Sequence, residues 1–278
     1  MGMIINNNLF ANNALRNLSN TQNDISKSME KLSSGLRINR AADDAAGLAI
    51  SEGLRSQVNG SGVAARNAQD AISVLQTADG ALTEVHSILQ RVRDLAVQAG
   101  NDSNNADSRA AIKKESDQLA AELTRIGAST NFNGIKLLDG GAQANMTFHV
   151  GAGGVAAEDQ IAVNMTTANV SAVGTAVAAL TFDTAANAAA SITAVDAQIK
   201  SISTERATIG AAQNRFESAS RSLAISQENL SAAESRIRDT DMAGEMVKFT
   251  KSNILSQAGT AMLAQANQTG QGVLQLLR

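Results

Sequence analysis

The 278-residue sequence contains no cysteine, proline, tryptophan or tyrosine, and it has six phenylalanines. The absence of cysteine excludes disulfide bonds and thiolate metal sites. Because one aromatic ring buries about 150 to 250 Å², a chain this poor in aromatics needs a thin, aliphatic core. The lack of proline agrees with this, because a proline inside a helix costs roughly 3 kcal/mol. The composition therefore favours long, uninterrupted helices packed through Leu, Ile, Val and Ala.

Long hydrophobic runs and a strong charge of one sign are also missing. No stretch approaches the ~18 consecutive apolar residues of a membrane span. The formal net charge of -3, with mixed signs, argues against a nucleic-acid partner, which would need a basic stripe. Residues 1–8 lack the basic segment and the apolar core of a secretory signal. We therefore expect no nucleic-acid partner, no membrane partner and no use of the general secretion route.

Both ends of the chain carry narrow apolar stripes at helical spacing. In residues 9–37 the stripe follows a heptad with polar Gln22 at one a position, and it consists of Leu15, Leu18, Ile25, Met29, Leu32 and Leu36. In residues 242–277 the stripe begins with Met242, Met246, Phe249, Ile254, Leu255 and Met262 and ends in Leu274, Leu276 and Leu277. A stripe this narrow requires a partner helix. We interpret the two ends as self-association surfaces.

Three further helices are predicted between the ends. Apolar residues step by three and four through residues 68–96, which predicts a rod about 40 Å long. After a loop at residues 100–107, the period restarts over residues 112–126, as expected for a helix that folds back antiparallel on the first. A third heptad pattern runs over residues 190–237. Its polar seam positions, which should fix the register, are Arg206, Gln213 and Ser226.

The segment from residue 130 to residue 180 differs in kind, since it is rich in Gly, Ala, Thr and Asn and shows little helical period. Asn133-Gly134 predicts a tight turn into a strand. Residues 146–150 and 160–165 alternate as strands do. We expect small β-hairpins here.

Groups that could support catalysis are few and scattered. His86 and His149 lie far apart, and neither has a second ligand at metal spacing. Asp43 and Asp44 could form a metal pair, but adjacent carboxylates on a helix point apart and more often cap a helix start. Gly151-Ala152-Gly153-Gly154 lacks the G-K-[ST] that would follow in a phosphate loop, which favours a flexible turn. We predict no enzyme, no metal and no cofactor.

Several segments resemble the bacterial flagellins. Residues 33–51, SSGLRINRAADDAAGLAIS, are similar to the N-terminal signature of that family. Further similar segments occur in the family's order at residues 4–8, 90–98, 130–134, 232–243 and 253–259. The likeness covers about residues 1–140 and 190–278. The chain thus resembles a short flagellin that lacks the large variable outer domains.

The resemblance implies a structural subunit that polymerises with itself into the flagellar filament, the propeller of motility. Family members are exported through the flagellum's own type III apparatus, which implies an extracellular location. The implied partners are further copies of the chain, an export chaperone for the C-terminal segment, and hook-associated and filament cap proteins. Two alternatives are a hook-filament junction protein, which shares such ends, and a secreted helical effector without a role in motility.

The family is also detected in animals by Toll-like receptor 5. The resemblance implies that the residues of this chain matching those recognised by the receptor are Gln90, Arg91, Leu95, Gln98 and Glu115. Asp94 stands where many relatives have Glu, which preserves the charge. The alternative interpretation is that these residues serve packing between neighbouring subunits, and both roles are compatible.

The predicted fold class is mainly α, a long antiparallel coiled-coil-like helical bundle with a small β-hairpin region in the middle of the chain. In the family the terminal helices line the filament's inner tube and the longer helices form an outer tube. On this basis we expect an N-terminal inner-tube helix, two outer-tube segments around a β-hairpin and variable loop region, and a C-terminal inner-tube helix. In chain order these are residues 1–44, 45–129, 130–189, 190–235 and 236–278.

Overall fold

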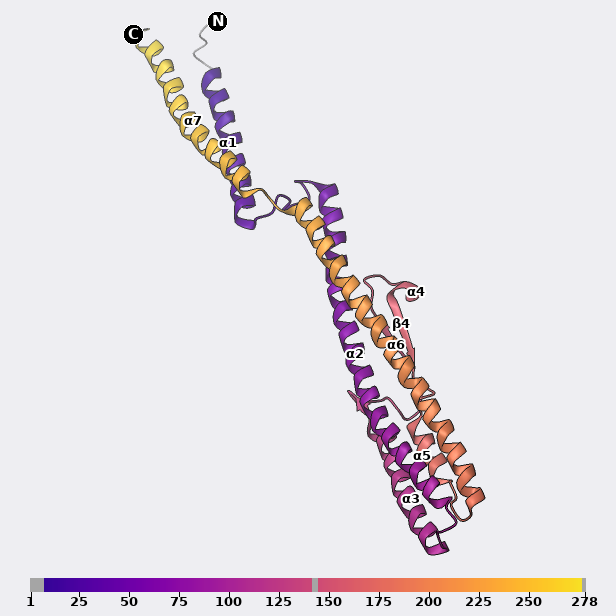
Figure 1. The fold of residues 1–278 in the computed structure, drawn as a ribbon. Helices are drawn as coiled ribbons and strands as arrows, with labels where there is room; N and C mark the ends of the chain where they lie inside the picture. Colours follow the sequence, from indigo (N-terminus) through magenta and orange to yellow (C-terminus); the bar gives the residue numbers. More distant parts are fainter. Residues whose placement is uncertain (1–7, 142–144, 277–278) are drawn as a thin grey trace. The chain divides into compact units, whose positions relative to one another are not determined.

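A computed structural model describes residues 8–141 and 145–276, which are mainly helical (Figure 1). The helices are α1 (Leu9–Ser34), α2 (Ala45–Ala99), α3 (Ala106–Ser129), α4 (Ala156–Asp159), α5 (Val170–Ala178), α6 (Ala185–Arg238) and α7 (Met242–Leu276). The strands are β1 (Asn131–Phe132), β2 (Ile135–Lys136), β3 (Asn145–His149) and β4 (Gln160–Asn164). The predicted class, mainly α with small β-hairpins, is confirmed.

The chain forms two compact units. The terminal unit comprises Met1–Ser56 and Asn229–Arg278, and the central unit comprises Gln57–Glu228. Residues 4–7 of the flagellin-like opening and Leu277 lie outside the described residues. For Leu274 and Leu276 the structure describes the backbone only.

The core of the central unit follows the predicted seam of α2. All the seam positions from residue 68 to residue 96 are buried, namely Ala68, Ala71, Leu75, Ala78, Leu82, Val85, Leu89, Val92 and Ala96. Burial of such a row on one face at spacings of three and four is what makes the long helix stable in water. The heptad prediction for this helix is confirmed.

Helix α3 folds back antiparallel on α2, as predicted. Arg109, near the start of α3, donates from Nε to the carbonyl of Ala99 at the end of α2, at 3.1 Å. One and a half turns further, Arg91 Nη2 lies 2.6 Å from Glu115 Oε1. The residue numbers of the contacts rise along α3, from 109 to 115, while they fall along α2, from 99 to 91. The two helices are therefore antiparallel.

Ion pairs between α2 and α6 fix their antiparallel register in the central unit. Arg206 Nε lies 2.8 Å from Asp79 Oδ1, and Arg93 Nε lies 2.6 Å from Asp196 Oδ1. Arg206 is half-buried at a seam position, so it supplies the register-fixing contact expected of a polar seam residue. Such exposed or half-exposed pairs contribute little stability, and their value here is alignment.

Two antiparallel strand pairs occupy the middle of the chain, as predicted. Strands β1 and β2 pair around the turn of Asn133 (φ 50°) and Gly134 (φ 80°). Strand β3 pairs with β4 over five positions, from Asn145 opposite Asn164 to His149 opposite Gln160. The Phe148 ring packs edge-on against Phe216 of α6, with ring centroids 5.4 Å apart.

Helix α5 was not predicted, because the segment was expected to hold hairpins only. It packs against α3 at a very close crossing. A Cβ on Gly127 of α3 would lie 2.8 Å from the Ser171 amide nitrogen, and one on Gly174 would lie 2.9 Å from the Thr124 amide nitrogen. Only glycine lets the two backbones approach this closely, and this packing holds the short helix in place.

Candidate functional site

The terminal unit is built on a pair of helices, α1 and α7, which lie side by side (Figure 1). On α1 the seam that faces α7 is buried or half-buried at spacings of three and four, through Ala11, Ala14, Leu18, Thr21, Ile25, Ser28 and Leu32. On α7 the matching positions are Glu245, Phe249, Ser252, Ser256, Gly259, Leu263 and Ala266. We call these residues the terminal seam. A Cβ on Gly259 would lie 3.4 Å from Leu18 Cδ1, so α7 packs closely on this leucine.

A buried polar contact joins the two helices within the terminal seam. Ser28 Oγ donates to Glu245 Oε1 at 2.7 Å, and Lys248 Nζ donates to Glu245 Oε2 at 3.2 Å. The Ser28 hydrogen bond and, secondarily, Lys248 lower the pKa of the Glu245 carboxyl, against the opposing effect of burial. An ionised carboxylate held by a hydroxyl in this way fixes how far α7 slides along α1.

The segments that connect the terminal helices to α2 and α6 are paired with each other. Leu36 and Asp239 form an isolated antiparallel β-bridge. Arg37 N donates to the Arg238 carbonyl at 2.6 Å, and Thr240 N donates to the Gly35 carbonyl at 3.0 Å. Helix α1 ends here because Gly35 adopts φ 74°, a left-handed conformation that suits glycine at a helix end. These contacts position the end of α1 beside the start of α7.

The structure corrects the predicted heptad of α1. Leu18, Ile25 and Leu32 lie in the terminal seam, whereas Gln22 is exposed and Leu15 and Met29 are 55% and 54% exposed. Leu36, also assigned to the stripe, lies beyond the end of the helix in the bridge to Asp239. The heptad had placed Leu15, Gln22 and Met29 in the seam with Leu18, Ile25 and Leu32. In the structure those seam positions are occupied by Ala14, Thr21 and Ser28. Helix α1 therefore carries two adjacent stripes. One contacts α7 and the other is bare.

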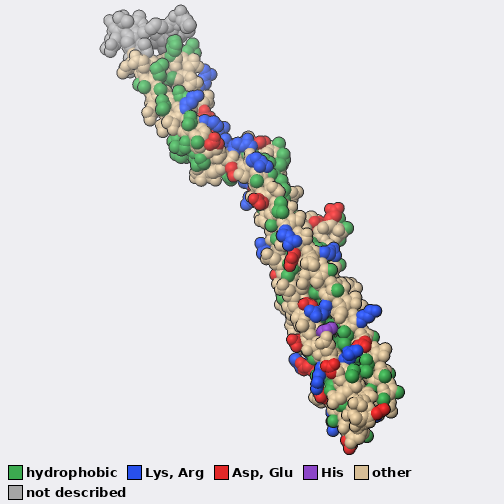
Figure 2. Space-filling view, viewed as in Figure 1, with side chains coloured by type: hydrophobic (Ala, Val, Ile, Leu, Met, Phe, Trp, Pro, Cys, Tyr) green, Lys and Arg blue, Asp and Glu red, His purple; other side chains and the backbone are tan. Residues whose placement is uncertain are grey.

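Helix α7 exposes its large apolar side chains on the side away from the terminal seam. Of the predicted residues, Phe249 is half-buried against α1, and the exposed ones are Met242, Met246, Ile254, Leu255 and Met262. On the face shown in Figure 2, hydrophobic side chains are visible on the surface of this helix pair. Leu9 and Phe10 at the start of α1 are also exposed and were not predicted.

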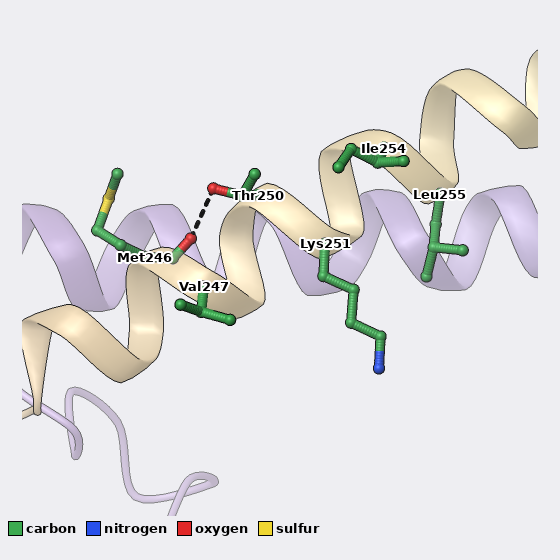
Figure 3. Close-up of a pocket in the computed structure, with 6 residues that line it drawn as sticks. All are labelled: Met246, Val247, Thr250, Lys251, Ile254 and Leu255. Carbon is green, nitrogen blue, oxygen red and sulfur yellow. Dashed lines mark hydrogen bonds between the residues drawn. The ribbon is translucent and has the colours of Figure 1, made fainter.

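An open, apolar hollow runs along this exposed side of α7 (Figure 3). Its volume is about 490 Å³, and it is lined by Met246, Val247, Thr250, Lys251, Ile254 and Leu255. These residues form two neighbouring rows at a spacing of four, which is the kind of groove into which the side-chain ridge of another helix packs. Thr250 Oγ1 donates to the Met246 carbonyl at 2.8 Å, so its hydroxyl is satisfied within the helix. We call this surface the α7 groove.

Asp43 and Asp44, which were considered as a metal pair, accept hydrogen bonds from nearby backbone amides. Asp44 Oδ1 accepts from Gly47 N at 2.8 Å at the start of α2, which confirms the predicted cap. Asp43 Oδ2 accepts from the amides of Arg40 and Asn39, and these bonds lower the pKa of its carboxyl. Across residues 8–141 and 145–276, no group of three His, Asp or Glu side chains could hold a metal ion.

The proposed receptor residues lie on α2 and α3 of the central unit. Gln90, Arg91, Gln98 and Glu115 are exposed, and Arg91 and Glu115 form the ion pair described above. The Gln90 side chain contacts His86 Nε2 at 3.0 Å. Leu95 is only 1% exposed and belongs to the core, so it can act on a partner only by positioning its neighbours.

Comparison with known proteins begins with two family profiles. The bacterial flagellin N-terminal helical region matches residues 5–143, and the bacterial flagellin C-terminal helical region matches residues 192–277. Together they cover both terminal helices and the long helices of the central unit. No helix in the part of the chain that the structure describes is long and apolar enough to cross a membrane.

Relatives that match almost the whole chain are also named flagellin. A flagellin of Halalkalibacterium halodurans is 53% identical over 276 residues, which cover 99% of this chain and 100% of the relative. A flagellin of Bacillus subtilis is 50% identical over 307 residues, with coverage of 99% and 100%. The crystal structure of Bacillus cereus flagellin is 34% identical and covers 57% of this chain and 88% of its own, with a TM-score of 0.49. The two matching profiles and these full-length relatives show that the chain belongs to the bacterial flagellin family.

Proposed function

We propose that the chain is a structural subunit that polymerises with itself into the flagellar filament, through the outward apolar faces of α1 and α7. One observation carries the proposal. The terminal helix pair alternates large apolar residues with small and polar ones in its internal seam, and it leaves Leu15, Met29 and the α7 groove exposed. The relatives named flagellin, and one named a flagellar filament 33 kDa core protein in Treponema phagedenis, support this assignment. The proposed role is mechanical and involves no catalysis.

Packing against sister copies would supply the missing burial. Each apolar surface removed from water contributes about 25 cal/mol per Å², and a filament places several copies around each subunit. The two rows of the α7 groove fit the ridge of a neighbouring helix, as in helix packing generally. Weak individual contacts would thereby add up to a cooperative polymer.

We predict that Met246→Asp and Ile254→Asp abolish polymerisation and leave the monomer's helix content unchanged. Each change places a charge in the α7 groove, where a partner helix could cover it only at high cost. Asn253→Asp is the matched control, because Asn253 is an exposed residue of α7 that does not line the groove. Salt-induced polymerisation seeded with filament fragments and followed by light scattering and negative-stain microscopy measures the effect. Normal filaments from both groove variants would refute the assignment of this face.

The same seeded assay separates the alternatives. A hook-filament junction protein would bind filament ends without elongating them. A secreted effector that acts on membranes would instead release dye from vesicles. The names of the relatives favour the filament subunit over both.

We further propose an extracellular location, reached through the flagellar type III apparatus, with an export chaperone that covers the C-terminal segment and with hook-associated and cap proteins at the filament's ends. The exposed apolar side of α7 supports the chaperone, since it would otherwise be bare in the cell. The inner-tube and outer-tube segments assigned from the sequence remain part of this proposal.

Toll-like receptor 5 is the proposed partner of the surface formed by Gln90, Arg91, Gln98 and Glu115, with Leu95 holding α2 in place beneath it. We predict that Arg91→Ala lowers receptor signalling at least tenfold, because a hydrogen bond to a charged group commonly contributes about 1.5–3 kcal/mol. Arg93→Ala is the matched control, since Arg93 forms a similar ion pair with Asp196 of α6. A cell-based reporter assay with monomeric protein measures this. Equal losses in both variants would exclude a specific role for Arg91.

A further inference from the structure

The sequence contains two Asn-Gly pairs, and the structure places them in opposite environments. Asn133-Gly134 forms the turn between β1 and β2, and both residues are exposed. Asn59-Gly60 lies in the interior of α2. Asn-Gly is the sequence in which an asparagine side chain is most readily attacked by the following amide, because glycine has no Cβ to obstruct the approach.

The turn leaves the attacking nitrogen accessible. Among the described residues, the Gly134 amide donates no hydrogen bond, because the β1–β2 pairing uses Phe132 with Ile135 and Asn131 with Lys136. A Cβ built on Gly134 would meet nothing within 4 Å, so the space around the turn is open. In α2, by contrast, each interior amide is bonded to the carbonyl one turn earlier. A Cβ on Gly60 would lie 3.0 Å from that of Ala152, so the space beside Gly60 is occupied, although the Asn59 side chain is exposed.

The hairpin around Asn133 can open at low cost. Each strand is two residues long, and Asn131, Ile135 and Lys136 are exposed. A two-stranded hairpin this short has little stability of its own, so the turn can leave its left-handed conformation without unfolding the core. Asn59 and Gly60 instead lie well inside the 55-residue helix α2, away from its ends, where helices open most readily.

We propose that Asn133 is a site of spontaneous deamidation in the folded chain, with water as the only co-reactant. The Gly134 nitrogen attacks Cγ of Asn133 and forms an N–C bond that closes a succinimide ring. The side-chain nitrogen leaves as ammonia and takes up the amide proton. Water then adds to one of the two ring carbonyls and opens the ring to aspartate or isoaspartate. No group is oxidised or reduced.

The product changes the turn in two ways. It adds a negative charge beside the paired strands. The isoaspartate form also inserts a methylene group into the backbone, and a two-residue turn of the type that requires positive φ at both positions cannot then keep Phe132 opposite Ile135. Because the reaction needs no enzyme, the modified form accumulates with the age of the molecule.

The two sites can be followed in one experiment on the full-length chain. Cleavage after Lys and Arg places Asn133 in the peptide of residues 126–136 and Asn59 in that of residues 56–66, each with a single Asn-Gly pair. After incubation of the folded protein in mildly alkaline buffer, mass spectrometry detects a gain of about 1 Da per event. Isoaspartyl methyltransferase with labelled S-adenosylmethionine detects the isoaspartate form.

We expect the 126–136 peptide to react at least about tenfold faster than the 56–66 peptide in the folded chain, because only its backbone opens locally. In denaturant the two rates should agree within about threefold, since the structural difference is gone. Asn133→Gly, which suits the turn equally well, should abolish the signal in its peptide. Equal rates in the folded chain would overturn the proposal. So would an unchanged rate difference in denaturant, or a signal that survives Asn133→Gly.

Discussion

The central and terminal units pack the same kind of helical seam with different residues. In the central unit the seam of α2 is filled by large aliphatic side chains such as Leu75, Leu82 and Leu89, which are fully buried. In the terminal unit the seam alternates Leu18, Ile25 and Leu32 with Ala, Thr and Ser, and none of these three is fully buried. The central unit thus has a core of its own, whereas the terminal helices need further partners to bury their apolar surface.

The largest expected effect is a difference between the two units in how much a truncated leucine lowers the free energy of unfolding. We predict that Leu89→Ala lowers the free energy of unfolding by about 3 kcal/mol, because it leaves a cavity in a fully packed seam. Leu15→Ala, the matched change on the bare stripe of α1, should alter it by less than about 0.5 kcal/mol. Denaturant unfolding followed by circular dichroism measures both. Comparable losses from the two changes would contradict the contrast between the units.

A smaller effect should be confined to the terminal pair. Ser28→Ala removes the hydroxyl that donates to buried Glu245, which should cost roughly 1–3 kcal/mol in the α1–α7 pairing. Hydrogen exchange should speed up in α1 and α7 and stay unchanged in α3. Ser26→Ala is the control, since Ser26 is exposed and bonds to the Gln22 carbonyl of its own helix. If both variants exchange alike, the buried contact does not hold the pair together.

The smallest effect is a pH dependence of the same contact. The pKa of Glu245 is lowered in the folded chain, so its contribution to stability is fully present above the ordinary glutamate value of about 4.3. That contribution is lost as the pH falls through the lowered folded value, because protonation removes the charge that Ser28 and Lys248 stabilise. Hydrogen exchange in α7 at decreasing pH measures the loss. Glu245→Gln should show no such dependence in this window, and an identical profile for both proteins would exclude Glu245 as the cause.

Much of the central fold could be predicted because its seam is unambiguous. Each seam position from Ala68 to Ala96 is apolar at a spacing of three or four, and the neighbouring apolar column of Val74, Ala81, Ile88 and Leu95 packs on the same core. The Asn133-Gly134 turn was equally clear, since few sequences tolerate positive φ at two successive positions. Hydrophobic periodicity is enough to predict a helix and its buried face where the apolar residues point to one face.

The terminal seam could not be assigned from the sequence, because Leu18, Ile25 and Leu32 fit two heptads. One pairs them with Leu15, Gln22 and Met29, and the other with Ala14, Thr21 and Ser28. Apolar size favours the first, whereas close packing of two helices favours the small residues, and only the structure decides. Three residues of the α7 groove were missed, and Val247 was among them because it lies beside the stripe of Met242, Met246 and Phe249. Thr250 and Lys251 were not counted as apolar, although the threonine hydroxyl is bonded within the helix and a lysine stem covers apolar surface.

Helix α5 was missed because it is stabilised by tertiary packing against α3 rather than by a clear pattern in its own sequence. Val170, Val173 and Val177 have helical spacing, but valine favours strands and the helix is only nine residues long. The backbone contact that Gly127 and Gly174 permit with α3 outweighs this preference. A glycine that enables such a contact cannot be told apart, in the sequence, from one that marks a loop.

The bridge between Leu36 and Asp239 constrains how the chain can be engineered. Because it fixes the point where one terminal helix ends and the other begins, an insertion or deletion of a single residue within either helix would rotate everything beyond it by about 100°. The bare stripe of Leu15 and Met29 would then face the paired helix α7, and the small residues of the terminal seam would face outward. Length changes in α1 or α7 therefore keep the terminal seam facing the partner helix only when they come in whole heptads.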